Sequence, residues 1–188
     1  MTIKESYKRQ HATFKMFKIP SLLVERKPKQ IIVIYTPHWT LEEEPTEIQT
    51  IALLAETLKI PLILLGTEEG LKTIPDKTFI KKITGDVHTQ APWLKLFDNV
   101  GKDSWAYING FGGVIQTLRD ANECLSMGIN VLALISSRNT KVEGLEIVEV
   151  LKGGRGSSMR VVEWRIKTKH KRKYSRHQKS GTSCSMTQ

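Results

Sequence analysis

A glycine cluster between an apolar run and an amphipathic stretch is the part of the sequence best suited to binding a ligand. Residues 104–113 read SWAYINGFGG, and apolar residues at helical spacing follow over residues 114–127. Glycines at the start of a helix let backbone N–H groups gather at its positive end, where an anion can bind. The expected phosphate contacts are Gly110, Gly112, Gly113 and, just past the next apolar run, Arg138.

Clustered positive charge at both ends of the chain is the second feature with chemical meaning. Residues 1–30 carry a net charge of +6 and residues 165–179 a net charge of +8, whereas residues 31–164 carry −4. Lys and Arg on chain extensions neutralise phosphates and release counterions, so the natural partner is RNA or DNA. The expected nucleic-acid contacts are Lys152, Arg155, Arg165, Lys167, Lys169, Lys171, Arg172, Lys173, Arg176 and Lys179.

Other interpretations of the basic ends stay open. A basic tail can serve solubility or nuclear import, and a scaffold for a protein partner would fit the same charges. An anionic membrane surface is disfavoured because residues 165–179 lack the apolar face of a membrane-surface helix. Lys152 and Arg155 flank glycines in what could equally be a plain solvated hairpin turn.

Catalytic, metal and cofactor signatures are not recognisable in the sequence. The five histidines are scattered, and no Gly-Lys-Ser/Thr loop or nucleophile elbow is present, so we expect no metal site, no cofactor and no assigned catalytic residue. Two cysteines, Cys124 and Cys184, favour an intracellular, reducing compartment, with a nuclear or organellar location suggested by the basic ends. No apolar run reaches the roughly 18 residues of a spanning helix.

Apolar periodicity predicts an α/β fold with three layers and a mostly parallel sheet. Continuous apolar runs are typical of buried parallel strands, whereas spacings of three and four residues indicate helices packed on the sheet. The predicted strands span residues 31–35, 61–66, 78–83, 105–109 and 129–135, the third at an edge, and the predicted helices span residues 45–58, 68–74, 93–100 and 114–127. Ligands of doubly wound sheets bind outside the carboxyl ends of the strands.

The last part of the chain changes pattern and defines the domain limits. Residues 145–150 and 159–166 alternate polar with apolar residues around a glycine-rich segment, which predicts a C-terminal antiparallel hairpin. We expect a basic arm over residues 1–29 with one short docked piece, a single domain over residues 30–167, and a basic tail over residues 168–188 that is disordered.

Two local predictions concern the helices on either side of the glycine cluster. Residues 85–92 are expected to form a loop before a helix that starts at Trp93. In the helix after the cluster, Gly128 is the expected C-terminal cap. The residues of that helix expected to face the sheet are Ile115, Leu118, Ala121 and Leu125.

The order of elements from Ile31 to Ile135, with residues 103–113 before a helix, resembles the lysine-decarboxylase-like phosphoribohydrolases. Those enzymes carry Pro-Gly-Gly-x-Gly-Thr-x-x-Glu at this point, where this chain has Asn109 for the proline and a rearranged Gly-Phe-Gly-Gly. The resemblance implies a nucleotide-binding, Rossmann-like enzyme. The glycine-led helix, strand and basic hairpin from Gly110 to Lys167 are similar to the Alba nucleic-acid-binding family, which implies a nucleic-acid partner.

These observations favour a non-enzymatic protein that binds RNA or DNA through basic extensions on an acidic α/β core. The alternative is a nucleotide-binding enzyme with a nucleoside phosphate at the glycine cluster. A nucleic-acid binder of this kind depends steeply on salt, whereas a nucleotide site in the core does not need the extensions.

Overall fold

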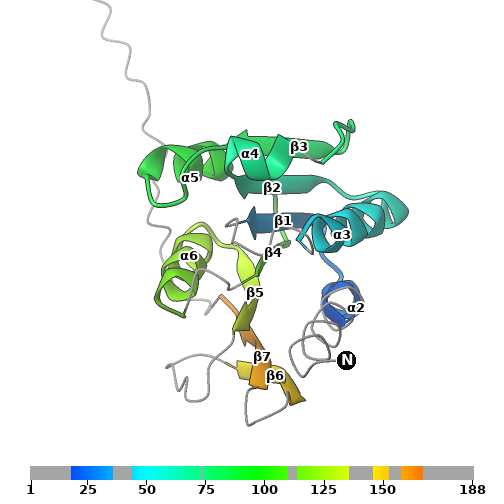
Figure 1. The fold of residues 1–188 in the computed structure, drawn as a ribbon, viewed down its shortest axis with the longest axis vertical. Helices are drawn as coiled ribbons and strands as arrows, with labels where there is room; N and C mark the ends of the chain where they lie inside the picture. The colour runs from blue at the N-terminus through cyan, green and yellow to red at the C-terminus, as the bar shows by residue number, and fades with distance from the viewer. Residues whose placement is uncertain are drawn as a thin grey trace, which may run out of the picture.

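Seven strands form one sheet within residues 18–35, 44–72, 74–109, 114–135, 146–152 and 158–166, which the computed structural model describes. The strand order is β3-β2-β1-β4-β5-β7-β6, and Figure 1 shows the sheet running from β3 to β6 and β7 at the other end. The strands are β1 (Gln30–Tyr35), β2 (Leu62–Gly66), β3 (Ile80–Thr84), β4 (Ser104–Ile108), β5 (Asn130–Ile135), β6 (Glu146–Lys152) and β7 (Ser158–Trp164). The helices are α2 (Ile19–Glu25), α3 (Glu44–Leu58), α4 (Glu68–Lys72), α5 (Gln90–Phe97) and α6 (Val114–Ser126).

The strand directions confirm the predicted fold class. Strands β1 to β5 are all parallel to their neighbours among themselves, whereas β7 runs antiparallel to β5 and pairs with β6 as a hairpin. The parallel part is doubly wound, because the chain builds outward from β1 to β3 and then returns to place β4 on the other side of β1. The weak run predicted as an edge strand is indeed the edge strand β3.

Two hydrophobic cores lie on the two faces of the sheet. One packs α2, α3 and α4 against one face, and the other packs α5 and α6 against the opposite face. In Figure 1, α2 and α6 lie on opposite sides of β4 and β5. Strands β1, β2 and β4 are buried at every position, which is why each appears in the sequence as an unbroken apolar run.

The short piece of the basic arm that docks on the domain is α2. Ile19, Leu22 and Leu23 are almost completely buried in the core beside α3. Pro20 lies in its first turn, where a missing N–H costs no helical hydrogen bond. The packed part of the chain therefore includes the residues just before β1.

The prediction that a loop extends to Pro92 is wrong, since α5 begins at Gln90. Thr89 has extended backbone angles and precedes the helix, and Pro92 sits in the first turn, where proline is tolerated. The predicted cap of α6 is confirmed: Gly128 has a φ of 83°, and its N–H donates to the carbonyl of Leu125.

The predicted orientation of α6 is wrong at its first turn. Ile115 is 82% exposed, although it was expected to face the sheet. The buried stripe of α6 contains Thr117, Asp120, Ala121 and Cys124 instead. Two polar residues therefore lie under the helix where periodicity would place apolar ones.

Candidate functional site

The common direction of the parallel strands gives the sheet two edges that carry different residues. The parallel strands all begin at one edge, here called the amino edge, and end at the other, the carboxyl edge. Because β7 is antiparallel, Arg160 pairs with Ile135 at the carboxyl edge, and Trp164 pairs with Val131 at the amino edge. The chain thus leaves β7 toward the C-terminal tail at the edge where β1 begins.

A buried carboxylate joins the two ends of the domain at this amino edge. Arg26, which follows α2, donates to Oε2 of Glu163 from Nε at 2.9 Å and from Nη2 at 2.5 Å. Arg165 donates from Nε to Oε1 of the same carboxylate. The Glu163 side chain is 1% exposed, whereas that of Arg26 is 14% and that of Arg165 is 65% exposed. Each of the two oxygens of this buried carboxylate therefore accepts from an arginine, one near each end of the chain.

Trp105 of β4 completes this arrangement, which we call the Glu163 cluster (Arg26, Trp105, Glu163 and Arg165). The guanidinium carbon of Arg26 lies 5.8 Å from the Trp105 ring centroid, and that of Arg165 lies 6.0 Å from it. Both distances are within the range of cation–π attraction. Ile166, the residue after Arg165, donates its N–H to Oδ1 of Asn130 at 3.0 Å, so the start of the tail is fixed to the start of β5.

The alternation of β7 explains why an acid is buried here. Val161 belongs to the core on the α2 side and Val162 to the core on the opposite side, so residue 163 falls on the α2 side. An acid at that position needs a cation within the core, and Arg26 at the end of α2 supplies it. The cluster therefore depends on α2 being docked on the sheet.

Further lysines surround the amino edge. Each lies within the three residues before β1, β2, β3 or β4, except Lys81, which is the second residue of β3. Lys29 pairs with Asp103 at 3.3 Å and Lys77 with Glu56 at 2.8 Å, both pairs being exposed. These lysines are Lys27, Lys29, Lys59, Lys77, Lys81 and Lys102. Together with Arg26 and Arg165, these lysines concentrate positive charge at the amino edge.

The structure brings together some of the predicted nucleic-acid contacts and separates others. Arg165 lies in the Glu163 cluster at the amino edge. Lys152 pairs with Ser158 at the far end of β7, about 20 Å away along a seven-residue strand. The other predicted contacts, Arg155, Lys167, Lys169, Lys171, Arg172, Lys173, Arg176 and Lys179, lie outside the described residues.

The predicted phosphate site follows β4, which ends at the carboxyl edge. Gly110, Gly112, Gly113 and Arg138 lie outside the described residues. Asn109, immediately before them, is 4% exposed, and its Nδ2 has no hydrogen-bond partner in the described part of the chain. A buried amide donor without a partner costs roughly 1–3 kcal/mol, which is a reason to look for a missing acceptor.

Buried polar residues under α6 lie near this edge, and the sequence analysis missed them. Asp120 is 1% exposed and accepts a hydrogen bond from Nε2 of Gln116 at 2.7 Å. Burial raises the pKa of Asp120 from 3.8 to about 6, although the Gln116 hydrogen bond and the electrostatic interactions with His88 and Arg119 act against the shift. A carboxyl with a pKa near 6 can exchange protons at neutral pH.

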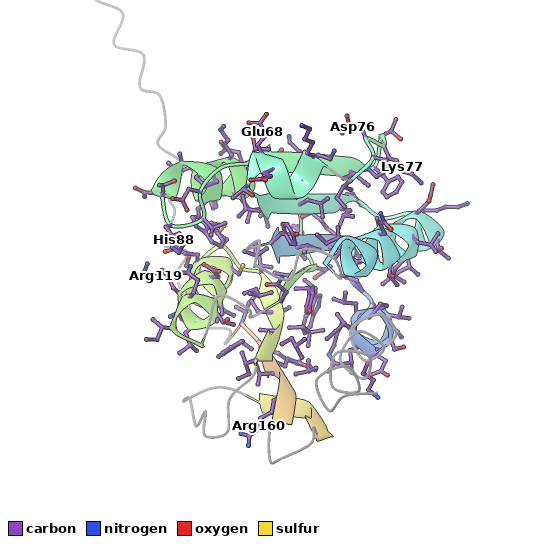
Figure 2. The ribbon with its side chains drawn as sticks, in the orientation of Figure 1. Glu68, Asp76, Lys77, His88, Arg119 and Arg160 are labelled. Atoms are coloured by element: carbon purple, nitrogen blue, oxygen red, sulfur yellow. The ribbon has the colours of Figure 1, made fainter. Side chains whose placement is uncertain are left out.

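A cavity lies between α5 and α6, beside Arg119, the residue before Asp120. It has a volume of about 320 Å³, and its lining includes His88, Arg119 and Glu123. In Figure 2, the His88 and Arg119 side chains lie next to each other on this flank, whereas Asp76 and Lys77 lie on the other side of the molecule. In the sequence, Asp120 lies three residues after Thr117 and four before Cys124, a spacing that puts all three on one face of the helix. The sequence analysis instead assigned the buried face from the apolar residues alone.

Comparison with known proteins assigns no family to this arrangement. No protein-family model matches the chain, and no curated protein matches it significantly. Over the residues that the structure describes, no group of three or more His, Cys, Asp or Glu side chains is placed to hold a metal ion. Within the same ranges, no helix is both long and apolar enough to cross a membrane. The two resemblances noted in the sequence stay predictions.

Proposed function

We propose that this protein binds nucleic acid, RNA or DNA, without an enzymatic activity of its own. The single observation that supports this proposal most is the Glu163 cluster, because it holds the end of the basic arm and the start of the basic tail together. Sixteen of the 29 Lys and Arg residues lie in residues 1–30 and 165–179. Two separate runs of charge can therefore act on one phosphate backbone from a common edge.

The physical basis of the binding is electrostatic. Each phosphate that is neutralised by Lys or Arg releases counterions, so affinity falls as a power of the salt concentration. Contacts made by chain extensions carry little sequence information, and we expect weak sequence preference. An intracellular, reducing compartment suits this function, and the buried free thiol of Cys124 is consistent with it.

The test compares three forms of the chain. We would measure binding of labelled 20-nucleotide RNA and DNA to the full chain between about 50 and 300 mM salt, to a chain ending at Ile166, and to a full-length chain with the seven cations of residues 167–179 changed to Gln. The neutral tail controls for length. We expect both altered forms to lose at least about tenfold in affinity at the lowest salt and to show shallower salt dependence.

The outcome that contradicts the proposal is equally concrete. If neither altered chain differs from the full chain, the tail does not bind nucleic acid. If the full chain shows no binding, and the purified protein has the same ultraviolet absorbance ratio before and after a high-salt wash, the basic ends serve another purpose such as import or solubility.

A second candidate, a nucleotide-binding enzyme, is favoured by the unpartnered amide of Asn109 and the raised pKa of Asp120. Asn109 follows the end of β4 beside β1, where doubly wound sheets bind ligands. This candidate function predicts that a nucleoside phosphate raises the melting temperature of the full chain, and that Asn109→Leu removes this shift. Ile115→Ala, on the exposed side of the first turn of α6, is the matched control. The absence of any shift across a nucleotide panel would count against this candidate.

A further inference from the structure

A hollow at the amino edge has a composition suited to an unpaired base. It has a volume of about 580 Å³ and lies between the C-terminal end of α3 and the first residues of β1, β2 and β3. Its apolar lining includes Ile60, Pro61 and Phe79. Cavities of 300–1,000 Å³ are the usual size for small ligands, and one nucleotide occupies only part of such a volume.

An aromatic ring and lysines occur together in this pocket. Phe79 is half-buried, and Nζ of Lys77 lies 5.6 Å from its ring centroid while also pairing with Glu56. Lys59 and Lys81 line the pocket as well. Lys59 has no ion pair within the described ranges, and Lys81 donates to the side chain of Asn99 rather than to an acid. The single acid in the lining, Glu56, is already neutralised by Lys77.

The polar groups inside the pocket are mostly engaged by the protein itself. Oε1 of Gln30 accepts hydrogen bonds from the N–H of Gly101 at 2.8 Å and from the hydroxyl of Ser104 at 2.7 Å. Its Nε2 donates to the carbonyl of Asn99 at 3.2 Å. The pocket therefore offers stacking on an aromatic face rather than a hydrogen-bond code, which is how proteins bind single strands with little sequence preference.

The pocket lies at the same edge as the Glu163 cluster. From β2, at the pocket, to β7, at the cluster, there are four strand spacings of about 4.8 Å, or roughly 19 Å. We propose that the pocket takes up an unpaired base of a single-stranded nucleic acid, stacked on Phe79, with its phosphates near Lys59 and Lys81. This inference rests on the proposed function, and it adds that single strands are preferred over duplexes, whose bases are already stacked.

The orientation of α3 limits where the phosphates can lie. The helix ends beside the pocket, with Lys59 in the left-handed region at a φ of 56°. The negative end of the helix dipole disfavours a phosphate inside the hollow and favours cations there. The base therefore goes inward and the phosphates stay outside, beside the exposed lysines.

The experiment uses the full chain and a 12-nucleotide RNA with one 2-aminopurine, as a single strand and as a duplex. Phe79→Leu removes the aromatic face and keeps an apolar side chain, and Lys59→Gln with Lys81→Gln tests the phosphate contacts. Each lysine is also changed singly, and Lys72→Gln, an exposed lysine on α4, is the charge-matched control for these single variants. Thermal unfolding reports whether each variant is folded.

We expect Phe79→Leu to weaken single-strand binding by at least about fivefold and to reduce the fluorescence quenching, with duplex affinity changed less than about twofold. Lys59→Gln and Lys81→Gln should each lower the single-strand affinity and flatten its salt dependence, and the two together should do so further, while Lys72→Gln should do neither. Ultraviolet crosslinking of a 4-thiouridine RNA to the unaltered chain should label the peptide that contains Phe79. This last readout holds even if Phe79→Leu does not fold.

Three results overturn the inference, and they are distinguishable from one another. Salt-sensitive binding by the full chain, with unchanged single-strand affinity in the pocket variants and crosslinks confined to the extensions, overturns the pocket alone and leaves the proposed function standing. Equal losses for single strand and duplex in Phe79→Leu also overturn it. Absence of binding by the unaltered chain overturns the proposed function and the pocket together.

Discussion

Arg26 donates two hydrogen bonds to the carboxylate of Glu163, which lies 137 positions later in the chain. The pair is mostly buried, and a cation just past the last strand, Arg165, contacts the same carboxylate. A buried ion pair is weak evidence for stability in itself, but removing one partner leaves an uncompensated charge. The contact therefore makes the docking of α2 and the end of β7 mutually dependent.

Removing the buried anion should destabilise the protein strongly. We expect Glu163→Gln to lower the free energy of unfolding by about 3 kcal/mol, because Arg26 would stay in the core without its counter-charge. Asp103→Asn, which breaks the exposed pair with Lys29, should change it by less than about 1 kcal/mol. Urea unfolding of both variants decides the comparison, and equal small effects would show that Arg26 is hydrated when unpaired.

The positions of the strands could be predicted from the sequence, and the Glu163 cluster could not. Runs such as residues 31–35 and 105–108 are apolar throughout because both faces of those strands are covered, and that pattern is visible locally. The contact between Arg26 and Glu163 depends on β7 pairing antiparallel with β5 and on α2 packing over β4. No local pattern encodes which distant strand an alternating segment will join.

The glycine-led helix shows a different limit. Its existence and its cap at Gly128 were predictable from periodicity and turn chemistry. Its rotation was predicted only in part. Ala121 is buried and Leu118 and Leu125 pack against the core, but Ile115 is exposed and the buried stripe also includes Thr117 and Asp120, which counting apolar residues cannot find. Such a conflict between local pattern and packing is typical of positions kept for a purpose other than stability.

The exposed position of Ile115 gives a direct check of that rotation. We expect Ile115→Ala to change the free energy of unfolding by no more than about 0.5 kcal/mol, since the side chain buries little surface. Leu96→Ala, at a fully buried position of α5, should cost about 2–5 kcal/mol. A cost in that higher range for Ile115→Ala would mean that the residue faces the core as periodicity suggested.

The close approach of α4 to the end of β1 sets a limit on residue size. A Cβ added at Gly70 would lie within 2.9 Å of Cδ1 of Tyr35, whose side chain is 2% exposed and has little room to move. Alanine gains at most about 1 kcal/mol in a helix relative to glycine, whereas overpacking costs about 1–3 kcal/mol. We expect Gly70→Ala to be destabilising by about 1–2 kcal/mol in urea unfolding.

A glycine where an added Cβ meets only ordinary contacts is the control for that prediction. At Gly101 an added Cβ would lie 3.6 Å from its nearest neighbour, Oε1 of Gln30, which is ordinary contact. Gly101→Ala should therefore change stability by less than about 0.5 kcal/mol. A stabilised Gly70→Ala variant would show that Tyr35 can shift at little cost.

Asp120 should make the stability of the protein depend on pH in a direction opposite to that of most carboxyls. Its pKa is raised in the folded chain, chiefly by burial, from 3.8 to about 6, so the folded state binds more protons than the unfolded state between these values. The contribution of Asp120 to stability is therefore most favourable below about pH 3.8, falls as the pH rises to about 6, and is level above that. The shift corresponds to about 3 kcal/mol at most.

Replacing the carboxyl with an uncharged group of the same shape isolates this effect. Asp120→Asn retains an oxygen that can accept from Gln116 and removes the cost of ionisation, so we expect it to stabilise the protein at pH 7.5 by up to about 3 kcal/mol. The gain should shrink steadily as the pH is lowered from 6 to 4, measured by urea unfolding at each pH. A gain that is the same at every pH would come from packing rather than from ionisation. If Asp120→Asn destabilises the protein at pH 7.5, the carboxylate has a cationic partner in the folded state that outweighs its burial.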